Sequence, residues 1–302
     1  MRPHRTVPTV ALTVVLITLG PALAACSSGS PSPGSPGAAH SGPSDPGAVD
    51  PDAVDPNSGV KPSESTASGR TVATYTAASA MSADQLQETV RRLKERAAAF
   101  GLTGIRIEQR GNVITADAPG DSGDRLRQLA ATAELAFRAV MGDHAEGSAE
   151  IRQRFDALTC PVTGTPPLSR PKEPTPACDA KTGQKYLLGP VALDGEDVKS
   201  AKSAYEPNSG QWMVNLNFTE RGAKTFGTVT AALAQETPPA NQFAILLDDD
   251  LLSAPAVQQA ITGGAAQIFG DFDRQRAEDL AALIGSGALP VRLTVSGVTR
   301  QP

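Results

Sequence analysis

Residues 82–101 read SADQLQETVRRLKERAAAFG, and this stretch sets the fold of the first half of the chain. Ser82 and Gln85 have the spacing of a capping box, in which each side chain binds the backbone N–H of the other residue. Gly101 is a typical helix stop. Apolar residues recur between these signals at helical spacing, namely Leu86, Val90, Leu93, Ala97 and Phe100. The stretch therefore predicts an amphipathic helix that packs one face on a core.

Strand signals flank this helix on both sides. A β-prone segment at 71–76 precedes it, and a hairpin turning at Gly111-Asn112 follows it. A second helix near 124–133 and a strand at 134–141 come next. The order β-α-β-β-α-β is that of a ferredoxin-like sandwich. We therefore expect a ferredoxin-like base lobe over residues 70–141.

A second mixed lobe, the head, is expected over residues 185–272. Its predicted elements are a short helix near 196–204, a strand at 212–218, a helix at 220–234 and a strand at 243–247. Residues 273–302 then supply a closing helix and strand. The predicted class is α+β, with a ferredoxin-like base lobe and an inserted or following α+β head lobe.

Residues 142–184 contain repeated prolines and predict an irregular loop rather than core elements. Cys160 and Cys178 lie in this loop, and we expect them to form a disulfide in an exported chain. A metal site is the alternative, but no Cys-x-x-Cys spacing supports it.

The N-terminus has the layout of a lipoprotein signal peptide over residues 1–25. Arg2 and Arg5 precede a short apolar run, and Leu23-Ala24-Ala25-Cys26 resembles a bacterial lipobox, in which the cysteine thiol receives the lipid. The alternative is an ordinary cleaved signal followed by a chance cysteine. We expect lipidation at Cys26 and a location at the outer face of the cytoplasmic membrane.

Residues 26–69 are rich in proline, glycine and serine, and they repeat Ala-Val-Asp-Pro. Such a composition cannot bury a core, so it predicts a disordered linker between the lipid and the folded lobes.

Composition excludes some classes of partner. The formal net charge is −5 and aromatic residues make up 4% of the chain, which argues against nucleic acid. Catalytic motifs, including a nucleophile beside a base, a His-Glu-x-x-His motif and a phosphate-binding loop, are missing from the sequence. We expect no enzyme activity and no cofactor. Asp248-Asp249-Asp250 is interpreted as a turn, with a hard cation site as the alternative.

Several strings resemble those of the SecD family of protein-export subunits, in the same order along the chain. They include Tyr186-Leu187-Leu188-Gly189-Pro190, Leu216-Asn217-Phe218-Thr219-Glu220-Arg221-Gly222-Ala223, Ser253-Ala254-Pro255, Ile261-Thr262-Gly263-Gly264 and Ser286-Gly287-Ala288-Leu289-Pro290-Val291. These strings are similar to the head of the large periplasmic domain of that family. Residues 85–140, including Glu134-Leu135-Ala136-Phe137-Arg138, are similar to its base.

The resemblance implies a domain that holds exported polypeptide, or contacts the export machinery, without a proton-driven motor. It implies a cleft between the lobes bordered by Ser253, Ala254, Pro255, Ile261, Gly263 and Gly264. A domain repurposed as a small-ligand receptor or a cell-envelope structural lipoprotein is the alternative.

Overall fold

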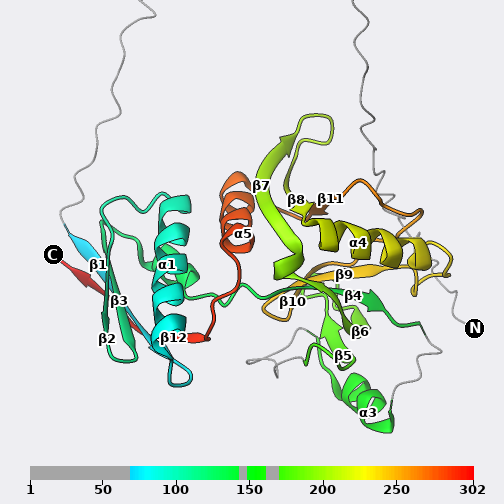
Figure 1. Ribbon diagram of the computed structural model, residues 1–302, viewed down its shortest axis with the longest axis horizontal. Coiled ribbons are helices and arrows are strands. Elements are labelled where there is room, and N and C mark those ends of the chain that lie inside the picture. Colours follow the sequence, from blue (N-terminus) through cyan, green and yellow to red (C-terminus); the bar gives the residue numbers. More distant parts are fainter. Residues whose placement is uncertain (1–68, 143–147, 161–169) are drawn as a thin grey trace, which may run out of the picture. The chain divides into compact units, whose positions relative to one another are not determined.

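The computed structural model describes residues 69–142, 148–160 and 170–302 as a mixed α+β protein (Figure 1). Its strands form antiparallel sheets of four, five and three strands. The α+β class predicted from the sequence is confirmed. The predicted signal peptide, Cys26 and the linker up to residue 68 lie outside the described residues.

The base lobe consists of β1 (Arg70–Ala77), α1 (Ala83–Ala99), β2 (Arg106–Arg110), β3 (Val113–Pro119), α2 (Gly123–Leu129) and β12 (Leu293–Gln301). The strand order is β12-β1-β3-β2, and every neighbouring pair is antiparallel. This is the ferredoxin-like arrangement. Its core contains Tyr75, Leu93, Ile114 and Leu126, all fully buried.

Helix α1 begins where the sequence predicts. The Ser82 hydroxyl accepts a hydrogen bond from the Gln85 backbone N–H at 3.2 Å, and the Gln85 side chain accepts one from the Ser82 N–H at 3.0 Å. Leu93 and Ala97 are fully buried, as the helical spacing requires. The capping box and the apolar face thus fix both the start and the orientation of the helix.

The head lobe contains the remaining elements, which are β4 (Leu135–Val140), α3 (Ala149–Ala157), β5 (Thr175–Cys178), β6 (Lys185–Asp194), the 3-10 helix η1 (Gly195–Asp197), β7 (Val198–Glu206), β8 (Gln211–Phe218), α4 (Glu220–Leu233), β9 (Phe243–Leu247), β10 (Asp250–Ser253), β11 (Ala265–Phe269) and α5 (Arg274–Ser286). The five-stranded sheet has the order β10-β9-β4-β6-β5, and the three-stranded sheet has the order β11-β8-β7. Residues of both sheets, α4 and α5 share one core, which includes Phe137, Val214, Phe226 and Leu280.

The prediction that residues 134–141 form the last strand of the base is wrong. This segment is β4, the central strand of the five-stranded head sheet, where it pairs with β6 and β9. Its two faces are both covered, since Phe137 packs in the core shared with α4 and Val140 in a second cluster. The base is instead completed by β12, which lies beside β1 in Figure 1 although the two strands are far apart in sequence.

The expected closing segment 273–302 is therefore divided between the lobes. Helix α5 contributes Ala277, Leu280 and Ile284 to the head core. Strand β12 belongs to the base and extends from residue 293 to 301, further than the predicted strand. The head is thus an insertion between α2 and β12 of the base.

The helix predicted near 196–204 is wrong as well. Only the single 3-10 turn Gly195–Asp197 is helical, and β7 follows at once. The strand pairs with β8 along its whole length, from Val198 opposite Phe218 to Glu206 opposite Gln211. Cross-strand pairing here overrides the local helix preference.

Residues 142–184 are less irregular than predicted, because they contain α3 and β5. The Ser148 hydroxyl caps α3 by accepting from the Ile151 N–H at 3.3 Å, and Ile151 is buried. Strand β5 is an edge strand, a position that tolerates Pro176.

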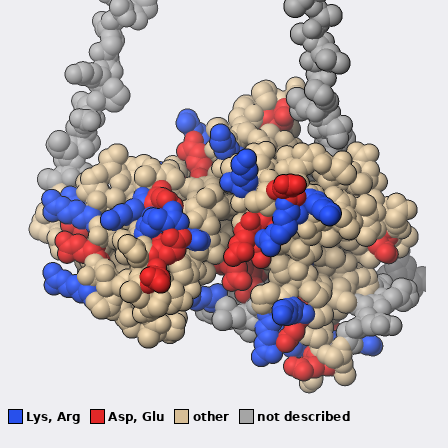
Figure 2. All heavy atoms as spheres, in the orientation of Figure 1, with Lys and Arg blue, Asp and Glu red and all other residues tan. Residues whose placement is uncertain are grey.

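The charged side chains on the face shown in Figure 2 are interspersed in sign, with broad uncharged areas between them. Several of them pair locally, as Arg91 does with Glu88 and Glu95 on α1. Such exposed pairs contribute little to stability.

A buried arginine joins the two lobes. Arg96 of α1 is fully buried, and burial lowers the pKa of its guanidinium to about 10, so it remains charged at neutral pH. It donates to the carbonyl of Leu129 at 3.0 Å, to that of Ala131, and to that of Thr132 at 3.2 Å. It also donates to the Ser286 hydroxyl and the Gly287 carbonyl, both at 2.9 Å. These partners lie where the chain leaves the base after α2 and returns after α5.

Replacing Arg96 with methionine should destabilise the protein strongly. Methionine keeps an unbranched apolar stem but leaves the carbonyls of Leu129, Ala131 and Gly287 without the guanidinium donor, at a cost of about 3 kcal/mol or more. The Thr132 carbonyl keeps its hydrogen bond from the Leu289 N–H. Urea unfolding should detect the loss. The matched control is Arg91→Met on the exposed face of the same helix, which should cost less than about 1 kcal/mol. Equal losses of unfolding free energy in the two variants would contradict the role of Arg96 in joining the lobes.

Candidate functional site

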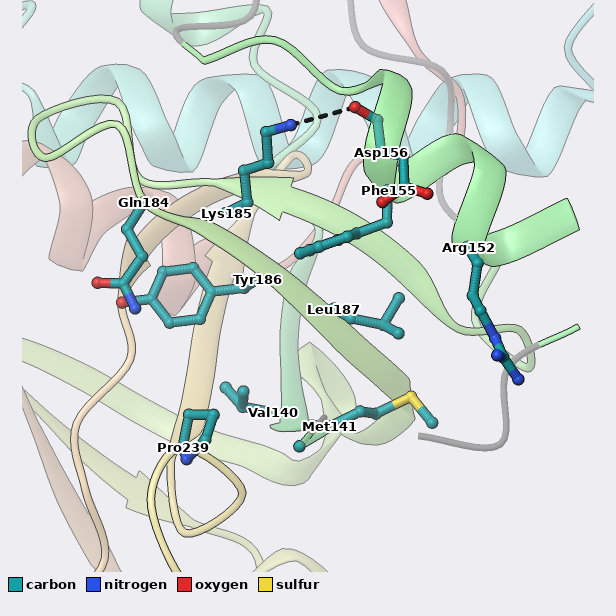
Figure 3. Close-up of a pocket in the computed structure, with 11 residues that line it drawn as sticks. Val140, Met141, Arg152, Phe155, Asp156, Gln184, Lys185, Tyr186, Leu187 and Pro239 are labelled. Carbon is teal, nitrogen blue, oxygen red and sulfur yellow. Dashed lines mark hydrogen bonds between the residues drawn. The ribbon is translucent and has the colours of Figure 1, made fainter. Parts of the chain in front are cut away.

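A cavity of about 310 Å³ lies between the five-stranded sheet and α3 (Figure 3). Val140 at the end of β4 and Tyr186 and Leu187 at the start of β6 line one side. Helix α3 lines the other side with Arg152 and Phe155. The volume is at the lower end of the range for ligand pockets.

The cavity adjoins an apolar cluster on the concave face of the sheet. The two edge strands, β10 and β5, approach each other, so the sheet curls. Its concave face carries the buried cluster Val140, Ala177, Tyr186, Leu188, Ala244 and Leu246. Two members of this cluster, Val140 and Tyr186, also line the cavity, and burial raises the pKa of the Tyr186 hydroxyl. The floor is therefore apolar with a neutral phenol at neutral pH.

A lysine lies at the boundary between this floor and α3. The Lys185 ammonium donates a hydrogen bond to the Asp156 backbone carbonyl at 3.3 Å, drawn as a dashed line in Figure 3. It also lies 6.0 Å from the centre of the Phe155 ring, within range of a cation–π interaction. The rim of the cavity is thus basic, while its floor is apolar.

A second buried arginine fixes the chain beside the cavity. Arg138 of β4 is fully buried, and burial lowers the pKa of its guanidinium. It donates to the carbonyls of Gly189 at 2.8 Å, Glu173 at 3.0 Å and Arg170 at 3.1 Å. The segment that leads into β5 is thereby attached to the sheet.

A disulfide holds α3 against the same sheet. It joins Cys160, three residues after the end of α3, to Cys178 at the end of β5, and their Cα atoms are 5.7 Å apart. Because Ile151 is the only buried residue of α3 among those described, the helix has little packing of its own. The disulfide therefore contributes much of what keeps this wall of the cavity in place.

Replacing both Cys160 and Cys178 with alanine should loosen the wall of the cavity. Loss of a crosslink of this length costs about 3 kcal/mol in the chain-entropy model. Hydrogen exchange should quicken in α3 and β5, while α1 in the base should exchange as before. Unchanged exchange in α3 would show that the disulfide does not hold it.

The six residues predicted to border a cleft do not line this cavity. The Ala254 carbonyl accepts from the Gln242 side chain at 3.1 Å, and the Pro255 carbonyl accepts from the Phe243 N–H at 3.0 Å. Ser253 pairs with Ile245 at the edge of the five-stranded sheet. All three residues therefore belong to the β9–β10 edge.

Ile261, Gly263 and Gly264 lie elsewhere in the head. The Ile261 N–H donates to the Thr230 hydroxyl of α4 at 2.9 Å, and the Gly264 carbonyl accepts from the Phe218 N–H at 2.9 Å. Ile261 packs against the core shared with α4, whereas Ala254 packs against the concave cluster. Gly264 has a φ of +70°, so a tight turn that needs a positive φ explains a glycine at this position. Polypeptide binding at the six residues stays a prediction.

The three consecutive aspartates form a hairpin turn. Asp248 and Asp249 join β9 to β10 with φ of 52° and 69°, the positive values that a two-residue type I′ turn requires. The Asp248 carboxylate accepts from the N–H groups of Ala133 and Glu134, both at 2.9 Å. Among the described residues, no group of histidine, cysteine and acidic side chains is arranged to hold a metal ion.

Replacing Asp249 with glycine should stabilise the protein. Glycine removes the cost of a positive φ, about 1 kcal/mol. Burial raises the pKa values of Glu134 and Asp250, and the Asp249 charge raises them further. Raised carboxyl pKa values mean that stability falls as pH rises above about 4, so removing this charge should help more at pH 7 than at pH 4.

Thermal melts at both pH values measure this effect. The control is Asp249→Ala, which removes the charge but keeps the Cβ atom and should gain less than glycine. A glycine variant no more stable than the alanine variant would contradict the proposed backbone strain.

The cavity was not predicted from the sequence. Phe155 and Arg152 were hidden in a segment predicted to be irregular, although Ser148 at the N-cap of α3 was a usable signal. Lys185 directly precedes Tyr186–Pro190, which resembles the SecD family. Its partner Asp156 contributes only a backbone carbonyl, which a pattern of side chains cannot reveal.

Comparison with known proteins identifies the head. Residues 173–291 match the family model of the SecDF P1 head subdomain. SecD, a protein translocase subunit of Streptomyces coelicolor, is 38% identical over 162 residues, which are 51% of this chain and 28% of that protein. SecDF of Thermus thermophilus is 31% identical over 222 residues, 71% of this chain and 28% of that protein.

The base and the head both match a solved structure described as SecDF, a membrane component that enhances protein export. It is 30% identical and has a TM-score of 0.52, and the match covers 75% of this chain and 98% of that one. The chain belongs to the SecD family. SecDF in a form called super-membrane-facing gives a TM-score of 0.55 at 29% identity, over 77% of this chain and 30% of that one.

The relatives are much longer than this chain. The chain spans about a quarter of the length of the Streptomyces coelicolor and Thermus thermophilus relatives. These relatives are named as translocase subunits and not as enzymes, in agreement with the prediction that the chain is not an enzyme. None of the described helices is both long and apolar enough to cross a bilayer.

Proposed function

We propose that this SecD-family domain binds exported polypeptide at the outer face of the cytoplasmic membrane and assists protein export or post-export folding. The activity that we propose is binding, without proton-driven movement. The observation that carries the proposal is the apolar cavity beside α3 in a domain that matches the SecDF P1 head. The apolar floor can accept side chains of many exported sequences, and the polar lining residues Arg152, Asp156, Gln184 and Lys185 can contact the polar groups beside them.

The proposed location rests on the N-terminal sequence. We propose that Cys26 carries the lipid and that residues 26–69 act as the linker to the base. Partners are then exported polypeptides or components of the export machinery. The names of the relatives, which are translocase subunits, support this choice of partners.

A small-ligand receptor, with or without a structural role in the cell envelope, is the second candidate. The volume of about 310 Å³ favours it, because a compact metabolite would fit as well as a side chain. A defined metabolite would then raise the melting temperature while unfolded peptides would not.

Photocrosslinking in secreting cells tests the leading proposal. A photoreactive residue in place of Met141, at the cavity, should trap exported polypeptides several-fold more often than one in place of Val113, an exposed residue of the base hairpin. Both experiments use the full chain.

Replacing Cys26 with serine in the same cells should release the protein from the membrane fraction and reduce the crosslinks formed at Met141. Equal crosslinking at Met141 and Val113, or trapping only of proteins that are not exported, would overturn the proposed function.

A further inference from the structure

The cavity contains a cation with no acidic partner. Lys185 donates to the Asp156 backbone carbonyl and faces the Phe155 ring, and it forms no ion pair with any carboxylate in the described residues. The nearby Asp179 carboxylate instead accepts from the backbone N–H groups of Lys181 and Thr182. The hydrogen bond and the ring contact place the Lys185 ammonium beside α3.

The rim of the cavity is basic, whereas the chain as a whole is acidic. Among the described residues that line the cavity, Lys185 and Arg152 are basic and Asp156 is acidic. The whole chain has a net charge of −5. A locally basic rim above an apolar floor fits a ligand that presents an apolar group and a carboxylate together.

An extended polypeptide presents these two groups at a defined spacing. Side chains two residues apart point to the same side of an extended chain and are separated by about 7 Å. An apolar side chain in the cavity therefore places the side chain two residues away on the protein side, where an acidic group can reach Lys185.

We propose that the cavity binds an apolar side chain of an extended exported polypeptide and that Lys185 pairs with an acidic side chain two residues away. The proposal rests on the proposed function and assigns its sequence preference. Phe155 and Asp156, which orient Lys185, precede the residues 173–291 that match the family model. The preference is thus a property of this chain's own α3.

Fluorescence anisotropy with labelled peptides tests the preference. Phe-Ser-Glu, Phe-Ser-Gln and Phe-Ser-Lys are placed in the same Gly-Ser host peptide and titrated with the full chain. The Glu peptide should bind most tightly and the Lys peptide least. Replacing Lys185 with glutamate should weaken the Glu peptide about fivefold to tenfold and strengthen the Lys peptide.

Two further variants separate charge recognition from misfolding. Lys199→Glu, at an exposed position on β7 away from the cavity, makes the same charge change and should leave the order of the peptides unaltered. Lys185→Met should remove the preference between Glu and Lys. A gain of binding for the Lys peptide in Lys185→Glu cannot arise from an unfolded protein.

The other outcomes overturn the proposal in distinguishable ways. If all three peptides bind equally and Lys185→Glu changes nothing, the charge preference is wrong and the proposed function stands. If no peptide binds, the proposed function fails at this cavity too. If 3-phenylpropionate binds and the peptides do not, the occupant is a small carboxylate and the domain is a ligand receptor.

Discussion

The structure depends on satisfying backbone carbonyls at the two places where the chain passes between base and head. The C-terminal ends of α2 and α5 both lie there, and helix ends leave carbonyls without partners. Arg96 reaches both ends from α1 and donates to their carbonyls within a buried site. One guanidinium thus donates hydrogen bonds to carbonyls at the ends of two helices. Its positive charge also interacts favourably with the partial negative charge of those helix C-termini. Without it, the insertion of the head into the base would bury unpaired polar groups at each crossing.

Short-range sequence patterns, such as capping boxes and apolar spacing, correctly predicted individual helices and strands. The capping box at Ser82, the apolar face of α1 and the five-residue strand β9 all appear where the sequence indicates. The assignment of strands to sheets could not be predicted in this way. Strand β4, Leu135–Val140, is mostly apolar, and only its pairing with β6 and β9 places it in the head. The base then needed a fourth strand, and the chain supplies it about 150 residues later as β12.

The candidate site was less predictable than the fold for a related reason. Its basic rim depends on a backbone carbonyl of α3 and on a disulfide that holds α3 to β5. The pairing of Cys160 with Cys178 was expected from their number and context, but the helix that the disulfide secures was not. The predicted cleft residues came from family resemblance, and five of them, Ser253, Ala254, Pro255, Ile261 and Gly264, make structural contacts within the head. The resemblance could not indicate the cavity, because Arg152, Phe155 and Asp156 of α3 precede the residues 173–291 that match the family model.

The pairing of β12 with β1 also determines how the domain would bear mechanical load. Tension on the polypeptide before Arg70 enters the folded part at β1, an inner strand hydrogen-bonded to β12 on one side and β3 on the other. A pull along that strand loads both ladders in shear, so many hydrogen bonds must break together. The head also contacts the base through α5, which packs against α1, but none of its strands belongs to the β12-β1-β3-β2 sheet. The cavity lies on the separate five-stranded sheet, so a pull at Arg70 first loads the ladders of the base and not the strands that line the cavity.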